Sequence, residues 1–191
     1  MSRRTLATIG AVTIVSLALM GAGRPAGTVP ASKWAATVCR SITTWRDDVA
    51  TGASSVRDAA QAPGATPSSV VGALAGYLRS VTAATRTSGR RITKAGVPDT
   101  RQGKRAAAAL AKGYSAAVKN LGRLAAEIDA MRDLPPARLA AAITPYEDPA
   151  RIDTAFTPIQ RGFEAMSRYD KDGRLEAAMA SQPACTALQN G

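Results

Sequence analysis

The 191-residue chain carries 25 lysines and arginines against 14 acids, a net charge of +11, and it contains two cysteines and no histidine. The lack of histidine excludes Ser-His-Asp and Cys-His catalysis, histidine metal ligands and histidine pH switches. The positive charge favours anionic partners such as phospholipid headgroups or phosphate-rich wall polymers.

The chain begins with two arginines, followed by an apolar run over residues 6–22 and then by small residues and prolines. This order is the layout of a secretory signal peptide. We therefore expect residues 1–31 to be a leader, with cleavage acceptable after Gly23 and preferred after Ala31. The alternative is an uncleaved anchor, because about 17 apolar residues are at the short edge of what spans a bilayer as a helix.

Residues 32–191 keep a net charge of +8 and are long enough for a single domain with its own core. In an exported chain, two distant cysteines predict one disulfide, between Cys39 and Cys185. A redox role would need a C-x-x-C motif or a thiol with a lowered pKa at a helix start. The two cysteines lie too far apart in sequence for that motif, so we expect a structural bridge.

Apolar residues recur at steps of three and four and predict an all-α fold. The first helix is expected over 33–61 with Ser32 as its N-cap. Thr66 followed by proline predicts a second helix that ends near residue 95. Asp99 is expected to cap a third helix that runs to about residue 132.

The pattern shortens after this third helix. A two-turn helix is expected over 136–143, and a fourth principal helix over 149–169, with a kink or break after Thr157 because proline follows. A last helical piece is expected over 174–180, with Pro183 to Leu188 as its continuation. Long helices with short connectors predict an antiparallel up-and-down bundle of about four long helices plus short C-terminal pieces.

Both tryptophans, Trp34 and Trp45, fall on one stripe of the first helix, since eleven residues make three turns plus roughly 20°. Cys39 lies at the margin of this stripe. Core packing is the favoured interpretation, because large aromatic side chains dominate core energetics. The alternative is a carrier that holds a small apolar ligand in the bundle interior, between these tryptophans and the faces of Phe156 and Phe163.

The segment around Asp170, Asp172 and Gly173 imitates the middle of a calcium loop. With this glycine at the sixth loop position, Arg168 and Met179 occupy the first and twelfth, where oxygen ligands are required. We expect instead a helix-terminating turn with Gly173 in the left-handed conformation. The residues predict no metal site and no cofactor.

Two pairs of adjacent acids occur, Asp47 with Asp48 and Glu147 with Asp148. Neighbours in a helix point about 100° apart, so neither pair forms an acid/base dyad. Asp148 is better explained as a helix cap. With no histidine and no recognisable nucleophile motif, we expect a protein that is not an enzyme.

The strongest functional signal is a group of cations around the turn between the second and third helices, here called the basic tip. Its members are Arg86, Arg90, Arg91, Lys94, Arg101, Lys104 and Arg105. A helical hairpin brings them to one end of the bundle, where they could hold an anionic envelope lipid or polymer. The alternative is a solvated helix end whose cations suit the helix dipole. Because no aromatic residues are interleaved, we expect no nucleic acid partner.

The layout as a whole resembles the small exported Ala/Arg-rich helical proteins of actinobacteria, many of which are uncharacterised. The resemblance is carried by the leader, by Trp34 with four residues between it and Cys39, by Trp45, and by the lone Cys185 near the end. It implies an envelope or extracellular setting without a reaction. The binding or structural role expected here is therefore non-catalytic.

Overall fold

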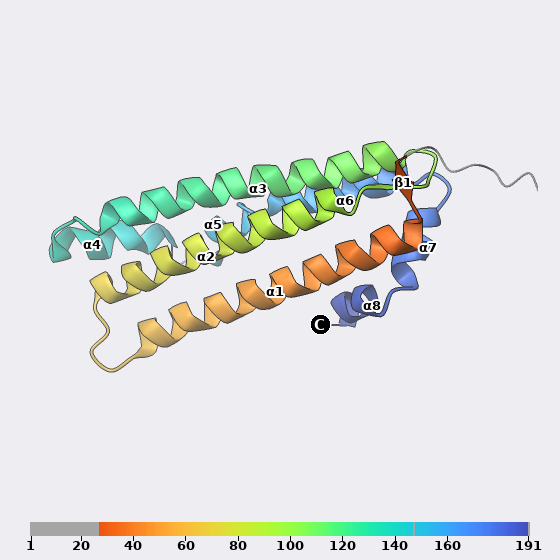
Figure 1. The fold of residues 1–191 in the computed structure, drawn as a ribbon. Coiled ribbons are helices and arrows are strands. Elements are labelled where there is room, and N and C mark those ends of the chain that lie inside the picture. The colour runs from red at the N-terminus through yellow and green to blue at the C-terminus, as the bar shows by residue number, and fades with distance from the viewer. Residues whose placement is uncertain (1–26, 147, 191) are drawn as a thin grey trace, which may run out of the picture.

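A computed structural model describes residues 27–146 and 148–190, and the fold is all-α as predicted. Three long helices lie side by side along the molecule (Figure 1), each packed against the next. They are α1 (Ala31–Gln61), α2 (Pro67–Lys94) and α3 (Gly103–Met131). Two short strands, β1 (Thr28–Val29) and β2 (Val97–Pro98), pair in parallel at the end where α2 joins α3.

Shorter elements complete the fold. They are α4 (Pro136–Ile143), the 3-10 turn η1 (Thr144–Tyr146), α5 (Pro149–Asp153), α6 (Thr157–Tyr169), α7 (Arg174–Ala180) and α8 (Pro183–Asn190). α4 packs against α2 and α3, α6 packs against α3, and the pair α7 and α8 packs against α1. The helix expected over 149–169 is broken, as predicted, but the break lies at residues 154–156 and not after Thr157. Pro158 then lies in the first turn of α6, where its missing N–H removes no helical hydrogen bond.

Of the N-caps predicted for the three long helices, one is confirmed and two are wrong. Thr66 caps α2 in a capping box, in which its hydroxyl accepts from the Ser69 N–H at 3.2 Å and Ser69 Oγ accepts from the Thr66 N–H at 2.9 Å. Ser32 does not cap α1, which begins at Ala31, two residues before the expected start. Asp99 does not cap α3; its Oδ1 accepts from the Ala31 N–H at 2.7 Å, so it serves the start of α1 instead.

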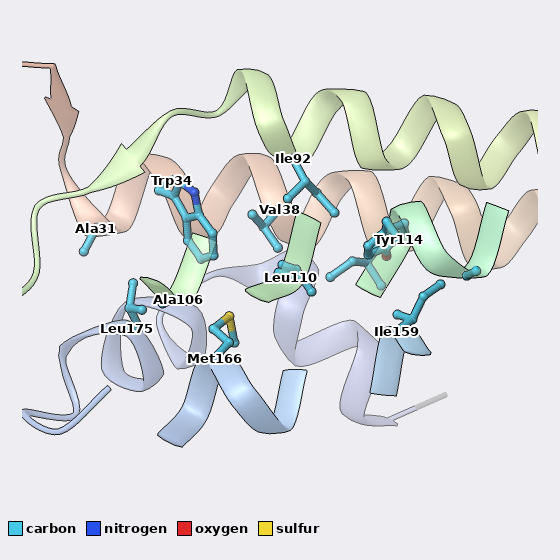
Figure 2. Close-up of a cluster of buried hydrophobic side chains, with 12 residues drawn as sticks. Ala31, Trp34, Val38, Ile92, Ala106, Leu110, Tyr114, Ile159, Met166 and Leu175 are labelled. Carbon is cyan, nitrogen blue, oxygen red and sulfur yellow. The ribbon is translucent and has the colours of Figure 1, made fainter. Parts of the chain in front are cut away.

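The core divides into two clusters along the length of the bundle. In the first, Trp34 and Val38 of α1 meet Leu110 of α3 and side chains from α6 and α7 (Figure 2). The second cluster, toward the other end, is built mainly from α2, α3 and α4, with Leu78 and Leu121 fully buried. Apolar side chains of the three long helices therefore supply most of the core.

Two glycines allow α3 and α6 to approach closely. A Cβ at Gly113 would lie 2.5 Å from the Pro158 carbonyl oxygen and 3.3 Å from the Gly162 Cα. Backbone atoms cannot move aside as a flexible side chain can. Gly113 and Gly162 therefore determine how closely α6 packs against α3.

The predicted disulfide is confirmed. Cys39 of α1 and Cys185 of α8 are bonded, with their Cα atoms 5.1 Å apart and both side chains buried. The first 26 residues of the predicted leader lie outside the described residues. Within the described ranges, no helix has both the length and the apolar character needed to cross a membrane.

Candidate functional site

The seven cations of the basic tip belong to the last turns of α2, the connector and the first turn of α3. The connector turns sharply because Gly96 adopts a left-handed conformation with φ of 86°. Gly103 then packs directly on the backbone of Pro98, which leaves no room for a side chain. All seven side chains are exposed.

Three members of the tip share a groove between α2 and α3. Arg86, Arg90 and Lys94 recur every four residues and line a hollow of about 420 Å³ together with Gly89 and Tyr114. A second hollow, of about 730 Å³, lies by the connector and is lined by Arg101, Lys104 and Arg105, with Gly27 and Thr28 opposite. The tip is therefore two neighbouring cationic grooves, and Arg91 lines neither.

No tip cation forms an ion pair within 4.0 Å in the part of the chain that the structure describes. Arg90 donates to the Thr87 hydroxyl and Arg105 to the Gln102 side chain, both at 3.2 Å. The single acid of this segment, Asp99, accepts from Ala31 and lies 3.8 Å from Arg174. Asp99 is thus directed to α1 and α7, and the positive charge of the tip stays uncompensated within the segment.

Both tryptophans pack against core side chains, and each donates a hydrogen bond to a residue of α2 or of the connector that carries the tip. The Trp34 side chain is fully buried, and its indole N–H donates to the Gly96 carbonyl at 3.1 Å. The Trp45 indole N–H donates to the Thr85 hydroxyl at 2.9 Å, and its ring meets the Tyr114 and Phe156 rings edge-on. Trp34 therefore ties the start of α1 to the α2–α3 connector, a role that helical periodicity alone does not indicate.

Tyr114 is the least satisfied polar side chain of the core. It is 1% exposed, and its hydroxyl has no hydrogen-bond partner among the described residues. Burial raises the pKa of Tyr114 to about 12, opposed slightly by the nearby Ser88 hydroxyl. The Ser88 hydroxyl itself donates to the Ser41 carbonyl at 3.2 Å, so the Tyr114 hydroxyl is left without a well-aligned hydrogen bond.

Replacing Tyr114 with phenylalanine should therefore leave stability unchanged or raise it at neutral pH, because an unsatisfied buried hydroxyl costs about 1 to 3 kcal/mol. The raised pKa means that folding favours the neutral phenol, so stability is intact below pH 10 and falls as the pH approaches 12. Across that window the wild type should lose about 3 kcal/mol more than the variant. Denaturant unfolding at several alkaline pH values measures the difference, and parallel curves for the two proteins would contradict it.

Two acids outside the tip cap short helices. Asp148 Oδ1 caps α5 by accepting from the Ala150 N–H at 2.9 Å, as predicted. The Asp170 carboxylate accepts from the Leu175 and Glu176 N–H groups at 3.0 and 2.8 Å and so caps α7. Gly173 is left-handed, with φ of 66°, as expected for the turn. Over the described ranges, no cluster of three or more acids and cysteines could hold a metal ion.

One surface feature has no counterpart in the sequence analysis. An open apolar groove of about 620 Å³ lies between α1, α2, α4 and α5, lined by side chains such as Val56, Val70 and Ile143. Tyr77 also lines it, and burial, together with the Asp153 carboxylate, raises the pKa of Tyr77. A groove depends on how far helices splay, which is not a property of any one helix, and no sequence signal marks it.

Comparisons of the chain with protein-family models, with curated proteins and with solved structures found no match. The resemblance to small exported actinobacterial proteins stays a prediction. A proposal for the function therefore rests on the sequence and on the geometry of the basic tip.

Proposed function

We propose that the chain is a non-catalytic binding protein of the cell envelope or extracellular space, and that its basic tip contacts phosphate groups of an anionic lipid or wall polymer. The observation that carries the proposal is the state of the seven tip cations, which are all exposed and form no ion pair within the described ranges. Exposed cations that are left without acids attract polyanionic surfaces. The hydrogen bond from the buried Trp34 to the Gly96 carbonyl holds the connector of the tip against α1.

Two features support the extracytoplasmic setting. The apolar run over residues 6–22 after two arginines is the layout of a leader. The bond between Cys39 and Cys185 is of a kind that persists in oxidising compartments. The same proposal treats α4, α5 and α6 as the segmented fourth element of an up-and-down antiparallel bundle, braced by the disulfide.

Neutralising the tip tests this function. Changing Arg90, Arg91 and Arg101 to glutamine should weaken binding to phosphatidylglycerol vesicles by about a hundredfold at low salt, because each cation near an anionic surface contributes about 1 kcal/mol. Vesicle cosedimentation measures the affinity, and circular dichroism checks that helicity is unchanged. The matched control replaces Lys33, Arg40 and Arg57 of α1, which removes the same charge from exposed sites that line neither cationic groove. Equal loss in both variants would show that net charge alone, without the tip, governs binding.

The apolar groove favours a second candidate function, a carrier of a small apolar ligand. The interior faces first expected to hold such a ligand are packed, since Trp34 is fully buried and Trp45 contacts Phe156. The groove beside Val56 and Ile143 instead stays open, with a volume suited to a small molecule. A carrier function would therefore use the end of the bundle far from the disulfide.

Filling the groove tests the carrier. Ala60 lines it and is exposed, so Ala60→Trp should place a ring over the hollow without disturbing the core. The variant should bind the neutral dye N-phenylnaphthylamine several-fold more weakly than the wild type. Ala50→Trp is the matched control, because Ala50 is exposed on the same helix and does not line the groove. Absence of dye binding by the wild type would reject this candidate.

A further inference from the structure

Charge is unevenly divided along the chain. Between Asp58 and Glu127 the only acid is Asp99. The same stretch holds the seven cations of the basic tip and four more, Arg79, Lys112, Lys119 and Arg123. The hairpin of α2 and α3 is therefore strongly cationic well beyond the tip.

Three of these additional cations continue a line that begins at the tip. Arg105, Lys112 and Lys119 are spaced by seven residues, which rotates each by only about 20° from the last, and Arg123 follows one turn later. All four are exposed, on the side of α3 away from the buried Leu110, Tyr114 and Leu121. The four residues, here called the α3 stripe, extend over about 27 Å at 1.5 Å per residue.

The surface around the α3 stripe is open and contains small side chains. Ala116 and Gly122 lie between the cations, and Ala126 lies just beyond Arg123, on a shallow hollow of the helix. On one side is the groove shared with α2, and on the other a groove of about 680 Å³ shared with α6, where Arg161 lies opposite Lys112 and Arg105. Each groove therefore carries cations along its edge.

No acid of the described chain neutralises the α3 stripe by a direct contact. Arg123 donates to the Asn120 side chain at 2.6 Å, and the stripe residues form no ion pair in the described ranges. The first acid beyond the stripe, Glu127, accepts from the Tyr146 hydroxyl at 2.7 Å and pairs with Arg151 at 3.4 Å. The positive line thus ends where Glu127 is held by other partners.

We propose that the α3 stripe extends the basic tip into a binding surface for a linear polyanion, a flexible chain of phosphate groups that lies lengthwise along α3. The inference rests on the proposed function and names the shape of its partner. A line of cations about 27 Å long matches repeated charges along a chain. A membrane surface is the poorer fit, because the small residues between the cations offer no large apolar side chain to insert into a bilayer.

Changing Lys112, Lys119 and Arg123 to glutamine tests the stripe. Binding to long-chain inorganic polyphosphate should weaken by about tenfold or more at low salt, and the slope of log affinity against log salt should fall by about 2, since three phosphate contacts are lost. Binding of tripolyphosphate, which covers only a small part of the surface, should be unchanged. The α1 variant of Lys33, Arg40 and Arg57 is again the control for net charge and should bind long-chain polyphosphate as the wild type does.

The outcomes separate this inference from the proposed function. If the stripe variant binds long-chain polyphosphate like the α1 control while the tip variant binds weakly, the linear surface is rejected and the tip stands. If the wild type binds neither polyphosphate nor anionic vesicles, both are rejected. If the stripe variant loses vesicle binding as much as polyphosphate binding, α3 faces a membrane and the linear polyanion is rejected.

Discussion

Replacing both Cys39 and Cys185 with alanine should lower the free energy of unfolding by about 2 to 5 kcal/mol. The bond closes a loop of 146 residues, nearly the whole fold, and a loop of that length loses much entropy in the unfolded chain when it is closed. The bond also holds α8 against α1, where α8 would otherwise be a short helix at the end of the chain. Denaturant unfolding of the oxidised wild type and the double variant measures the loss.

Reduction provides the control for this prediction. The wild type in reductant should unfold near the midpoint of the double variant, while the variant itself should not respond to reductant. Both sulfur atoms lie in buried side chains, so the alanines also remove some packing, and the reduced wild type separates that contribution. Equal midpoints for the oxidised and reduced wild type would show that the bridge adds nothing to stability.

Local signals in the sequence were sufficient for most helices. Thr66 with Pro67 starts α2, Pro136 starts α4, and the turn at Gly173 precedes α7, in each case where the sequence predicted. These signals act within a few residues, through a side-chain cap, a fixed φ or a left-handed glycine. Such interactions can be recognised without knowing the neighbours of the helix.

Errors occurred where the decisive contact is distant in sequence. Asp99 has the right chemistry for an N-cap, but it serves Ala31, which is 68 residues away, and not the helix that follows it. Ser32 was expected at the start of α1 because it is the nearest capping residue. The carboxylate from the connector instead accepts from the first N–H of that helix, which no local pattern can reveal.

The candidate site was predicted in composition but not in shape. The spacing of Arg86, Arg90 and Lys94 placed them on one face of a helix, and they do line one groove. Whether Arg91 or Arg101 joins them depends on the path of the connector and on the packing of Gly103 against Pro98. The seven-residue spacing of Arg105, Lys112 and Lys119 is a sequence signal for the α3 stripe, and it lies mostly outside the interhelical turn.

A chain that begins at Ser32 should be less stable than one that begins at Arg24 by about 3 kcal/mol, the size expected for losing a hydrogen bond to a charged group and weaker bonds beside it. Removal of the preceding residues deletes the 2.7 Å bond from Ala31 to Asp99 and the 2.8 Å bond from the Asp99 N–H to the Val29 carbonyl. The strand pair is lost as well, and so is the Pro30 carbonyl that accepts from the Trp34 N–H at 3.0 Å. Thermal unfolding of the two chains measures the difference.

A double-mutant cycle separates these contacts from a general effect of shortening. Asp99→Asn should destabilise the chain that begins at Arg24 more than the chain that begins at Ser32. The shorter chain has already lost the Ala31 N–H that donates to the Asp99 carboxylate. Equal costs in both would show that the two sites are independent. Of the two cleavage positions that the sequence allows, the one after Gly23 keeps every one of these bonds and the one after Ala31 removes them. If the proposed leader is cleaved, these bonds favour the position after Gly23 over the position after Ala31 that the sequence pattern alone prefers, and the intact mass of the protein from its native host tests this.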